Sequence, residues 1–358
     1  MKAIIMAGGG GTRLFPLSRK SMPKQFLAID SDSSLLEETI RRCKSFAGDE
    51  DIMIVTNELY KQHVERELKH AEAQAASVVL EPVARNTAPA IALAAKFAQD
   101  KLGAGWDEVL VVSTSDHIIR PAVTFKAAVG LAVKAAEKGK FVTFGVHPSY
   151  PETGFGYIEM GEESEGAYKT LSFKEKPDLD TAKFYLKQGN YLWNSGMFAF
   201  RLGDFFEELK KHAPAVYELT RGTYEEMADS FAKMPDISID YAVAEHTEEG
   251  VTLPLPCYWN DVGSWDAIYD VLEKDGEGNA LQGDVVSIDS KRNLIYGKKR
   301  LIATVGLEDA LVVETDDVIL VAGRGQSQKV KELVAELKAQ GRKETETITD
   351  FREKTHGK

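Results

Sequence analysis

A run of glycines followed by an arginine offers the clearest phosphate-binding chemistry in the sequence. The segment after the apolar run Lys2–Met6 includes Gly8-Gly9-Gly10-Gly11-Thr12-Arg13. Consecutive glycines let backbone N–H groups approach a phosphate without obstruction by Cβ atoms, and Arg13 adds a fixed positive charge. The spacing fits neither a dinucleotide G-x-G-x-x-G pattern nor a Walker A loop. The first requires glycine at position 13 or 14 and the second requires Gly-Lys at 13–14, where this sequence has Arg13 and Leu14. We interpret the run as a phosphate loop in preference to a tight turn with spare glycines.

The next segment, residues 16–25, is irregular, bounded by prolines and cationic in a chain whose formal net charge is −12. Arg13 and Lys24 together could neutralise a triphosphate, the first as a planar fork and the second as a point charge. Taken alone, Arg19, Lys20 and Lys24 are more simply interpreted as solvated loop charges.

Two aspartates are suited to hold a divalent cation. Asp116 follows the apolar run Val109–Ser113, and Asp261 lies in a loop flanked by Trp259 and Trp265. Magnesium is commonly bound through one or two carboxylates together with phosphate oxygens. A loop aspartate considered by itself is more often a helix N-cap or a turn residue, so both interpretations stay open for each acid.

The elements that must position these residues alternate between strands and helices in the first half of the chain. Strands are predicted over 2–6, 52–56, 78–80, 109–113 and 141–146, and helices over 35–46, 58–71, 88–101 and 124–138. This alternation predicts an α/β fold with a mainly parallel sheet, whose ligands collect at the carboxyl ends of the strands.

The second half has a different texture. Strands are predicted over 155–160, 168–174 and 191–200, helical patterns over 204–218 and 224–246, and five short strands between 284 and 322. A Gly-rich, charged boundary near 272–283 divides a catalytic domain at 1–275 from a small β-rich domain at 276–341. A helix is predicted over 329–338, and residues 342–358 form a polar tail.

Composition excludes several classes of protein. The chain has 358 residues, 43% apolar and 28% charged, which is typical of a globular protein. The sequence lacks a long basic run, which would indicate nucleic-acid binding. It also lacks a stretch of eighteen apolar residues, which would indicate a membrane span. Two cysteines far apart and the lack of a signal-peptide pattern favour the cytoplasm.

The motifs together carry a family resemblance. Residues 7–25 resemble the signature loop of sugar-nucleotide pyrophosphorylases, A-G-G-x-G-T-R-L-x-P-L-S-x-x-x-P-K, and the ending 23–26 is similar to the mannose-1-phosphate guanylyltransferase branch. Further matching blocks follow in order at 81–82, 85–90, 115–117, 153–158, 173–177, 193–198, 238–242 and 259–265. The departures are mild: Gly10 stands where serine is common, and Phe15 where tryptophan is common.

The resemblance implies a fold and a reaction. The fold is a nucleotide-diphospho-sugar transferase, a Rossmann-like α/β/α sandwich with a small, left-handed β-helix-like C-terminal domain that often serves dimerisation, so a homodimer is expected. The reaction is in-line attack of mannose 1-phosphate on the α-phosphorus of GTP, with Mg²⁺, to give GDP-mannose and pyrophosphate. Some members carry a further phosphomannose isomerase domain, which we do not expect in this chain.

The resemblance also assigns residues. The catalytic residues are Arg13, Lys24 and Lys176, and the metal ligands are Asp116 and Asp261. The nucleotide is bound by Gly8, Gly9, Gly10, Gly11, Thr12, Arg13, Lys24, Glu81, Arg85, Asn86, Thr87 and Asp116. The sugar is bound by Gly154, Glu175, Lys176, Asn194 and Asp240.

Two alternatives remain at this point. The chain could join another pair of substrates, such as glucose 1-phosphate with dTTP or UTP. It could also be a non-catalytic regulatory subunit that senses GDP-mannose. The presence of Arg13, Lys24, Asp116 and Asp261 argues against the second alternative, because a silent relative is expected to have lost some of them.

Overall fold

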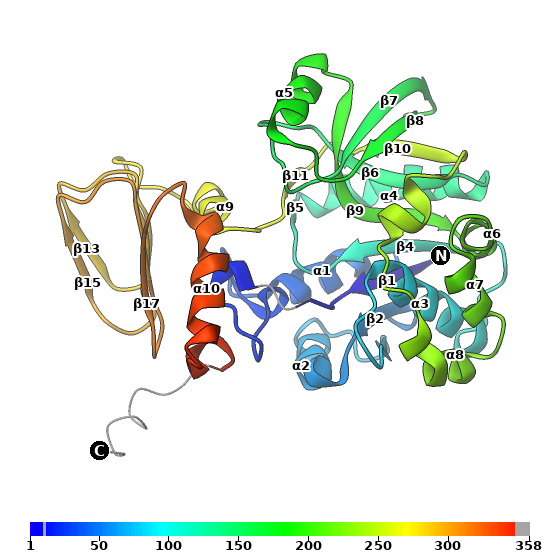
Figure 1. Ribbon diagram of the computed structural model, residues 1–358, viewed down its shortest axis with the longest axis horizontal. Helices are drawn as coiled ribbons and strands as arrows, with labels where there is room; N and C mark the ends of the chain where they lie inside the picture. Colours follow the sequence, from blue (N-terminus) through cyan, green and yellow to red (C-terminus); the bar gives the residue numbers. More distant parts are fainter. Residues whose placement is uncertain (10–11, 348–358) are drawn as a thin grey trace. The chain divides into compact units, whose positions relative to one another are not determined.

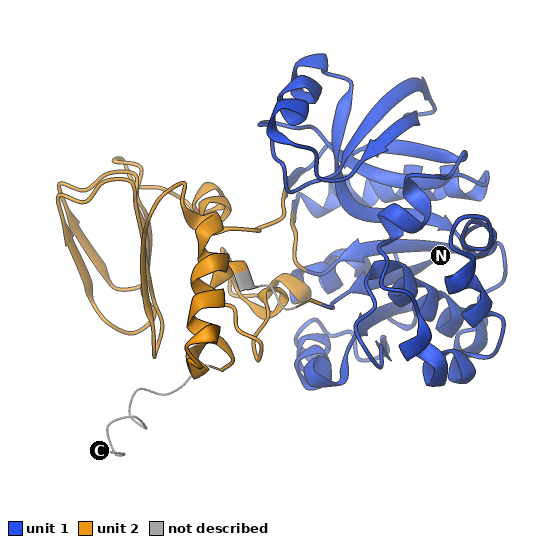
Figure 2. Ribbon diagram, in the orientation of Figure 1, with its two compact units in different colours: residues 1–8, 37–115, 119–259 blue, residues 9–36, 116–118, 260–358 orange. Residues whose placement is uncertain are grey.

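The computed structural model describes residues 1–9 and 12–347 (Figure 1). The predictions made for Gly10, Gly11 and the tail 348–358 therefore lie outside the described residues. The chain forms two compact units that are discontinuous in sequence (Figure 2). Unit 1 comprises 1–8, 37–115 and 119–259, and unit 2 comprises 9–36, 116–118 and 260–358. The continuous division at residue 275 remains a proposal.

Unit 1 is built on a mixed sheet. Within the described residues, nine strands lie in the order β3-β2-β1-β4-β9-β6-β10-β8-β7. Their bounds are β1 (Lys2–Met6), β2 (Ile52–Thr56), β3 (Ser77–Leu80), β4 (Val109–Thr114), β6 (Phe141–Val146), β7 (Tyr157–Ser164), β8 (Ala167–Lys174), β9 (Tyr191–Arg201) and β10 (Gly250–Pro254). Strands β3, β2, β1 and β4 are mutually parallel, whereas β9 runs antiparallel to β4, β6 and β7. The α/β class and the five predicted strands of the first half are confirmed within two residues.

Helices cover both faces of this sheet. Their bounds are α1 (Leu35–Lys44), α2 (Lys61–His70), α3 (Thr87–Lys101), α4 (Ala122–Glu137), α5 (Leu179–Gln188), α6 (Leu202–His212), α7 (Pro214–Thr220) and α8 (Tyr224–Ser230). Successive residues of a strand point to opposite faces. Thus Leu110 packs in the cluster that includes α3 and α6, while Val111 packs in the cluster that includes α4. The result is the three-layered α/β/α arrangement that the sequence predicts.

Local signals explain where the predicted helical segments break. The predicted helix 204–218 is two helices, because Pro214 begins α7 and cannot continue α6. The predicted segment 224–246 is also divided. A capping box between Thr223 and Glu226 starts α8, which ends at Ser230, and a separate π-helical turn follows at Asp240–Ala244.

Unit 2 contains short strands stacked in parallel, as in a β-helix. The strands are β12 (Ala280–Gln282), β13 (Val285–Ile288), β14 (Leu294–Tyr296), β15 (Ile302–Val305), β16 (Ala310–Glu314) and β17 (Ile319–Gly323), and the helices are α9 (Trp265–Val271) and α10 (Val330–Ala339). Strands β12, β14 and β16 pair in parallel, as do β13 and β15, and β17 closes the first sheet antiparallel to β16. Asn293 supports the stack from inside, since its amide donates to Asn279 Oδ1 at 2.9 Å and to the Leu307 carbonyl at 2.7 Å.

Two short strands, β5 (Ile118–Arg120) and β11 (Tyr258–Asn260), occur where the chain passes between the units. None of the helices in the described part of the chain has both the length and the apolarity needed to cross a bilayer.

Candidate functional site

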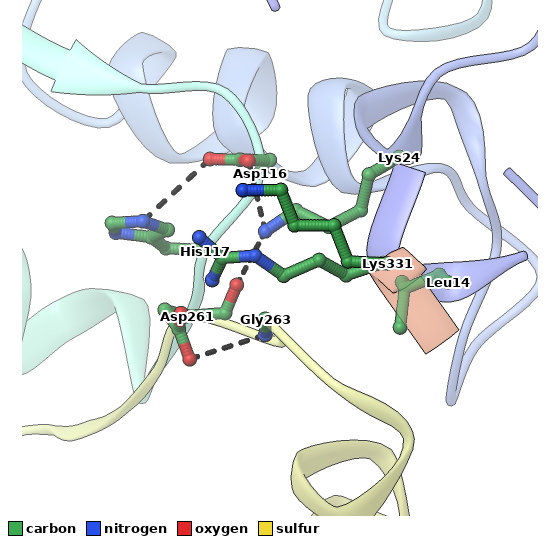
Figure 3. Close-up of a pocket in the computed structure, with 8 residues that line it drawn as sticks. Leu14, Lys24, Asp116, His117, Asp261, Gly263 and Lys331 are labelled. Atoms are coloured by element: carbon green, nitrogen blue, oxygen red, sulfur yellow. Dashed lines mark hydrogen bonds and ion pairs between the residues drawn. The ribbon is translucent and has the colours of Figure 1, made fainter. Parts of the chain in front are cut away.

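Unit 2 has a pocket that gathers charged residues from four segments that are far apart in the sequence. Its volume is about 410 Å³, and Figure 3 shows the side chains that line it. The lining residues are Arg13, Leu14, Lys24, Asp116, His117, Asp261, Gly263 and Lys331. The structure therefore brings together both predicted metal ligands and two of the three predicted catalytic cations. The arrangement suits a polyanion bound together with a divalent cation.

Lys24 connects the two aspartate segments. Its ammonium lies 2.8 Å from Asp116 Oδ2 and donates to the backbone carbonyl of Asp261 at 2.5 Å. Burial of Asp116 disfavours its charge, but the charges of Lys24 and His117 prevail and hold its pKa below the usual range. Asp116 is therefore ionised at neutral pH, which is the form that binds a metal ion. Since one ammonium contacts both segments, the two aspartates belong to one local site.

The Asp261 loop has a constrained backbone. Asp261 Oδ1 accepts from the N–H of Gly263 at 3.1 Å, and Asn260 Oδ1 accepts from the N–H of Val262 at 2.7 Å. A Cβ atom at position 263 would lie 2.3 Å from Asp261 Oδ2, so a larger residue there would force the Asp261 carboxylate to move. The buried Trp265 at the start of α9 donates its indole N–H to the Phe15 carbonyl at 2.9 Å. This bond ties the Asp261 loop to the loop that carries Arg13 and Lys24.

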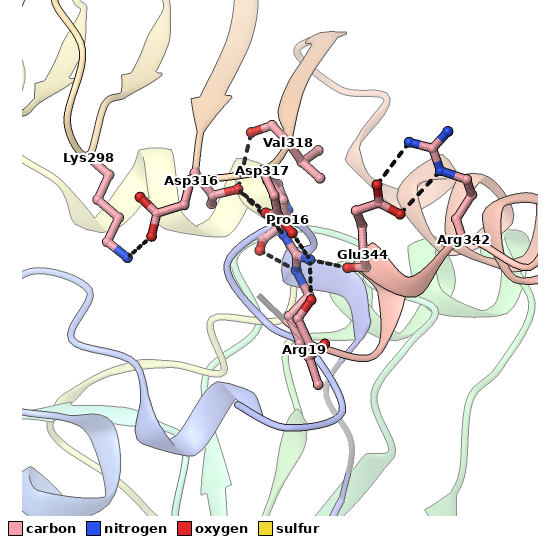
Figure 4. Close-up of polar contacts among 10 residues, drawn as sticks. Pro16, Arg19, Lys298, Asp316, Asp317, Val318, Arg342 and Glu344 are labelled. Atoms are coloured by element: carbon pink, nitrogen blue, oxygen red, sulfur yellow. Dashed lines mark hydrogen bonds and ion pairs between the residues drawn. The ribbon is translucent and has the colours of Figure 1, made fainter. Parts of the chain in front are cut away.

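The same loop is anchored by a buried arginine (Figure 4). The Arg19 guanidinium pairs with Asp317 at 2.9 Å, donates to the carbonyls of Pro16 and Glu344, and lies 4.9 Å from the centre of the Phe15 ring. Both Arg19 and Asp317 have fully buried side chains. The interpretation of Arg19 and Lys24 as solvated loop charges is therefore wrong: both are less than a tenth exposed, because they bind carboxylates and carbonyls within unit 2. Lys20 is exposed, as that interpretation predicts.

Unit 1 has a second pocket, of about 570 Å³, with a different chemistry. Its lining residues are Asn86, Thr87, Glu175, Lys176, Asp236, Ile237, Ser238, Asp240 and Tyr241. Thr87 Oγ1 accepts from the N–H of Ile239 at 2.8 Å, and the Asn86 amide donates to Asp236 at 3.2 Å. The first turn of α3 is thereby fixed against the 236–241 segment. Most of the polar groups that line this pocket can bind hydroxyl or amide groups.

Glu175 offers a free acceptor in this pocket region. Its Oε1 pairs with the Lys176 ammonium at 2.7 Å, while its buried Oε2 has no hydrogen-bond partner among the described residues. A buried carboxylate oxygen without a partner is costly, so a ligand hydroxyl at this position would stabilise it. The absence of a side chain at Gly156 makes space for the Glu175 carboxylate. A Cβ atom at position 156 would lie 2.5 Å from Glu175 Oε2.

Asn194 contacts a second carboxylate of this pocket, that of Asp240. Its amide donates to Asp240 Oδ1 at 2.7 Å, and its own Oδ1 accepts from the Gly196 N–H at 2.9 Å. Burial, with the nearby negative charge of Glu175, raises the pKa of Asp240 to about 6. The Glu175 contact with Lys176 likewise raises the pKa of that lysine, which is therefore fully charged at neutral pH.

The remaining predicted residues lie in other local settings. Glu81 has a pKa raised to about 7 by burial, and a Cβ atom on Gly8 would lie 3.0 Å from its Oε1. Arg85 donates to the Ala232 carbonyl at 2.6 Å, and the Gly154 N–H donates to Glu152 at 2.7 Å. Their assignments to the base and the sugar stay predictions.

A family model for nucleotidyl transferases matches residues 2–278, and a model for the MannoseP isomerase/GMP-like β-helix domain matches residues 283–337. The chain belongs to the nucleotidyl transferase family. The predicted fold, with its β-helix-like C-terminal region, is thereby confirmed, as is the resemblance drawn from the signature loop and the ordered blocks.

Curated relatives of this transferase match nearly its whole length. The xanthan biosynthesis protein XanB of Xanthomonas campestris pv. campestris is 47% identical over 351 residues, which cover 95% of this chain and 74% of the relative. The mannose-1-phosphate guanylyltransferase of Escherichia coli (strain K12) is 40% identical, with 95% and 74% coverage. The crystal structure of a mannose-1-phosphate geranyltransferase from Thermus thermophilus matches with a TM-score of 0.85 and 32% identity, covering 94% of this chain and 99% of that one.

Sequence reasoning missed several residues that line the pockets of this transferase. Asp236 and Tyr241 flank the predicted Asp240, and their places in the pocket depend on how the 236–241 segment turns against α3. Lys331 lies on α10, where a lysine is ordinarily a solvated surface residue. No signal in the sequence distinguishes Lys331 from the other lysines of that helix.

Proposed function

We propose that this transferase makes GDP-mannose and pyrophosphate from GTP and mannose 1-phosphate. The observation that carries the proposal is the unit 2 pocket, which collects Arg13, Lys24, Asp116 and Asp261 around one small volume. These are the groups that a nucleotidyl transfer between two polyanions needs. The choice of guanine and mannose is supported by the relatives named as mannose-1-phosphate guanylyltransferases, at 40% and 41% identity.

The transfer requires positioning and charge neutralisation more than proton transfer. The phosphate of mannose 1-phosphate is largely ionised near neutral pH, since its second pKa is about 6, so it needs no general base. Its oxygen attacks the α-phosphorus of GTP, a new P–O bond forms, and pyrophosphate leaves. Arg13 and Lys24 stabilise the negative charge on the phosphates, and Asp116 and Asp261 would hold Mg²⁺. When bound, the metal supplies further positive charge to the phosphate oxygens.

The pocket of unit 1 is proposed to hold the sugar phosphate. Glu175 Oε2, Asp240 and Asn194 supply acceptors and a donor for sugar hydroxyls, which cannot be buried without partners. Lys176 supplies one positive charge for the phosphate group. Asn86 and Thr87 line the same pocket, and we retain Glu81 and Arg85 with them as the groups that meet the guanine base.

The test is pyrophosphate release by the purified protein with Mg²⁺. Mannose 1-phosphate is offered with each of GTP, ATP, UTP, CTP and dTTP, and the series is repeated with glucose 1-phosphate. We expect release mainly from GTP with mannose 1-phosphate. Release from glucose 1-phosphate with dTTP or UTP would keep the mechanism and replace the substrates. No release from folded protein that binds GDP-mannose would identify a regulatory subunit instead.

We also propose a homodimer that forms through the β-helix of unit 2. Val286 and Ile288 of β13 are 52% and 55% exposed, and Val305 of β15 is 76% exposed. The parallel register pairs Ile288 with Val305, so these residues lie on one face of the β13–β15 sheet. An exposed apolar strand face is a typical interaction surface. Light scattering should give twice the chain mass, and Val305→Asp should give a monomer.

A cytoplasmic location completes the proposal. It is supported by the two thiols, which are both free. Burial raises the pKa of Cys43 to about 12, so this thiol stays protonated and unreactive. Fractionation of cells that express the chain should recover it with the cytoplasmic enzymes.

A further inference from the structure

The third cation of the unit 2 pocket comes from the C-terminal helix. Lys331, in the first turn of α10, lines the same pocket as Arg13, Lys24, Asp116 and Asp261. Its side chain extends into this group of residues in Figure 3. The residue lies within 283–337, the part of the chain that matches the β-helix family model.

The backbone that carries Lys331 is held in place from two sides. Val330 and Val334 on α10 are buried in the same core cluster as Leu14 and Trp265. Just before the helix, Ser327 Oγ donates to Asp266 Oδ2 at 2.5 Å, and the Gly325 N–H donates to Asp266 Oδ1 at 2.8 Å. Asp266 lies in the first turn of α9, directly after the Asp261 loop. The position of Lys331 is thus coupled to the loop that presents the predicted metal ligand.

The charges of the pocket indicate that Lys331 is available to bind an anion. Lys24 already contacts Asp116 and the Asp261 carbonyl. By contrast, Arg13 and Lys331 form no ion pair with any residue in the ranges 1–9 and 12–347. Arg13, Lys24 and Lys331 face the carboxylates of Asp116 and Asp261 in this pocket, so Lys331 adds a positive charge beyond the two that these carboxylates balance. A polyphosphate gains most from a cation that no carboxylate already neutralises.

We propose that Lys331 binds the terminal phosphates of the nucleoside triphosphate, and hence also the pyrophosphate product. This inference rests on the proposed function, and it deepens that function by giving the β-helix region a direct part in substrate binding. Lysine suits the role, because its flexible stem and three donors can follow a phosphate group. The sugar phosphate is left to Lys176, which belongs to the other pocket.

The variant Lys331→Gln tests the inference, with Lys331→Arg as the conservative exchange. Lys338→Gln is the matched control, because it removes the same charge from an exposed position of the same helix. We expect Lys331→Gln to raise the KM for GTP, and the KM for pyrophosphate in the reverse reaction, by roughly tenfold, since a charge-assisted contact is lost. The KM for mannose 1-phosphate should stay unchanged. Lys331→Arg should recover most of the affinity, and Lys338→Gln should behave as wild type.

Calorimetric binding of pyrophosphate with Mg²⁺ separates this inference from the proposed function, since it needs no turnover. Weaker binding to Lys331→Gln than to wild type, at an unchanged melting temperature, supports the inference even if the substrate panel names another sugar or base. Equal binding and equal KM values in the two proteins would overturn the Lys331 assignment alone. A wild-type protein that binds neither pyrophosphate nor GTP would overturn both proposals.

Discussion

The two pockets differ in the sign of the charge that lines them. In the described residues, the unit 1 pocket presents three carboxylates and one lysine, whereas the unit 2 pocket presents three cations and two aspartates. A sugar phosphate needs several hydrogen-bond acceptors for its hydroxyl groups and one cation for its phosphate group. A triphosphate is bound through cations, with carboxylates only where a metal ion is needed. The difference in charge supports the assignment of the triphosphate to the unit 2 pocket and of the sugar to the unit 1 pocket.

The largest expected effect is a loss of activity when the metal-binding group of the unit 2 pocket is changed. Asp261→Asn removes a metal-binding charge but keeps the Oδ1 acceptor for the Gly263 N–H, so the loop should keep its shape. Metal ions supply several kcal/mol of transition-state stabilisation, so kcat should fall by about a thousandfold or more. Pyrophosphate release measured across Mg²⁺ concentrations checks this. Full activity in Asp261→Asn would remove this residue from the metal site. Asp284→Asn, at an exposed position of the same unit, is the control.

The second-largest expected effect is a loss of stability when the buried Arg19–Asp317 ion pair is broken. Asp317→Ala leaves the Arg19 guanidinium buried without its carboxylate, and such a loss typically costs about 3–5 kcal/mol. Urea unfolding should show this destabilisation, and the KM for GTP should rise more than that for mannose 1-phosphate. The adjacent Asp316 pairs with the more exposed Lys298 (Figure 4) and Lys299, so Asp316→Ala should cost less than about 1 kcal/mol. Equal destabilisation by both variants would show that the Arg19 pair is no anchor.

The third effect belongs to unit 1. Lys176→Ala removes one charge-assisted contact, worth about 1.5–3 kcal/mol, from the proposed sugar-phosphate pocket. The KM for mannose 1-phosphate should therefore rise by at least about tenfold, while the KM for GTP changes little. Lys174→Ala, at an exposed position two residues earlier, is the control. A rise in the KM for GTP alone would reverse the assignment of the two pockets.

The same comparison explains what sequence could and could not predict. The bounds of strands β1 and β2 can be predicted to the residue, because buried parallel strands form continuous apolar runs between turn signals. Arg13, Lys24, Asp116 and Asp261 were assigned to one site through family motifs, and the structure brings them together. The burial of Arg19 was missed because its partner Asp317 lies 298 residues away, and local sequence carries no record of such pairs. Lys331 was missed for the same reason, since only the folding of α10 against the signature loop brings it to the pocket.

The smallest effect is a dependence of stability on pH, whose sign should differ between Asp240 of unit 1 and Asp116 of unit 2. The pKa of Asp240 is raised to about 6 from an ordinary value of 3.8. The folded protein therefore holds this proton more tightly than the unfolded chain does. Stability from Asp240 is present below about pH 4 and is lost as the pH rises toward 6.

Asp240→Asn cannot titrate, so the variant should lack this part of the decline. We expect a difference on the order of 1 kcal/mol, since the side chain is only partly shielded from solvent. Unfolding free energies of wild type and variant, measured from about pH 4 to 7, give the comparison. Asp116, whose pKa is lowered, has the opposite sign: its contribution is lost only as the pH falls. Parallel pH curves for wild type and Asp240→Asn would mean that the pKa of Asp240 is the same in the folded and the unfolded chain, and the raised pKa would then be wrong.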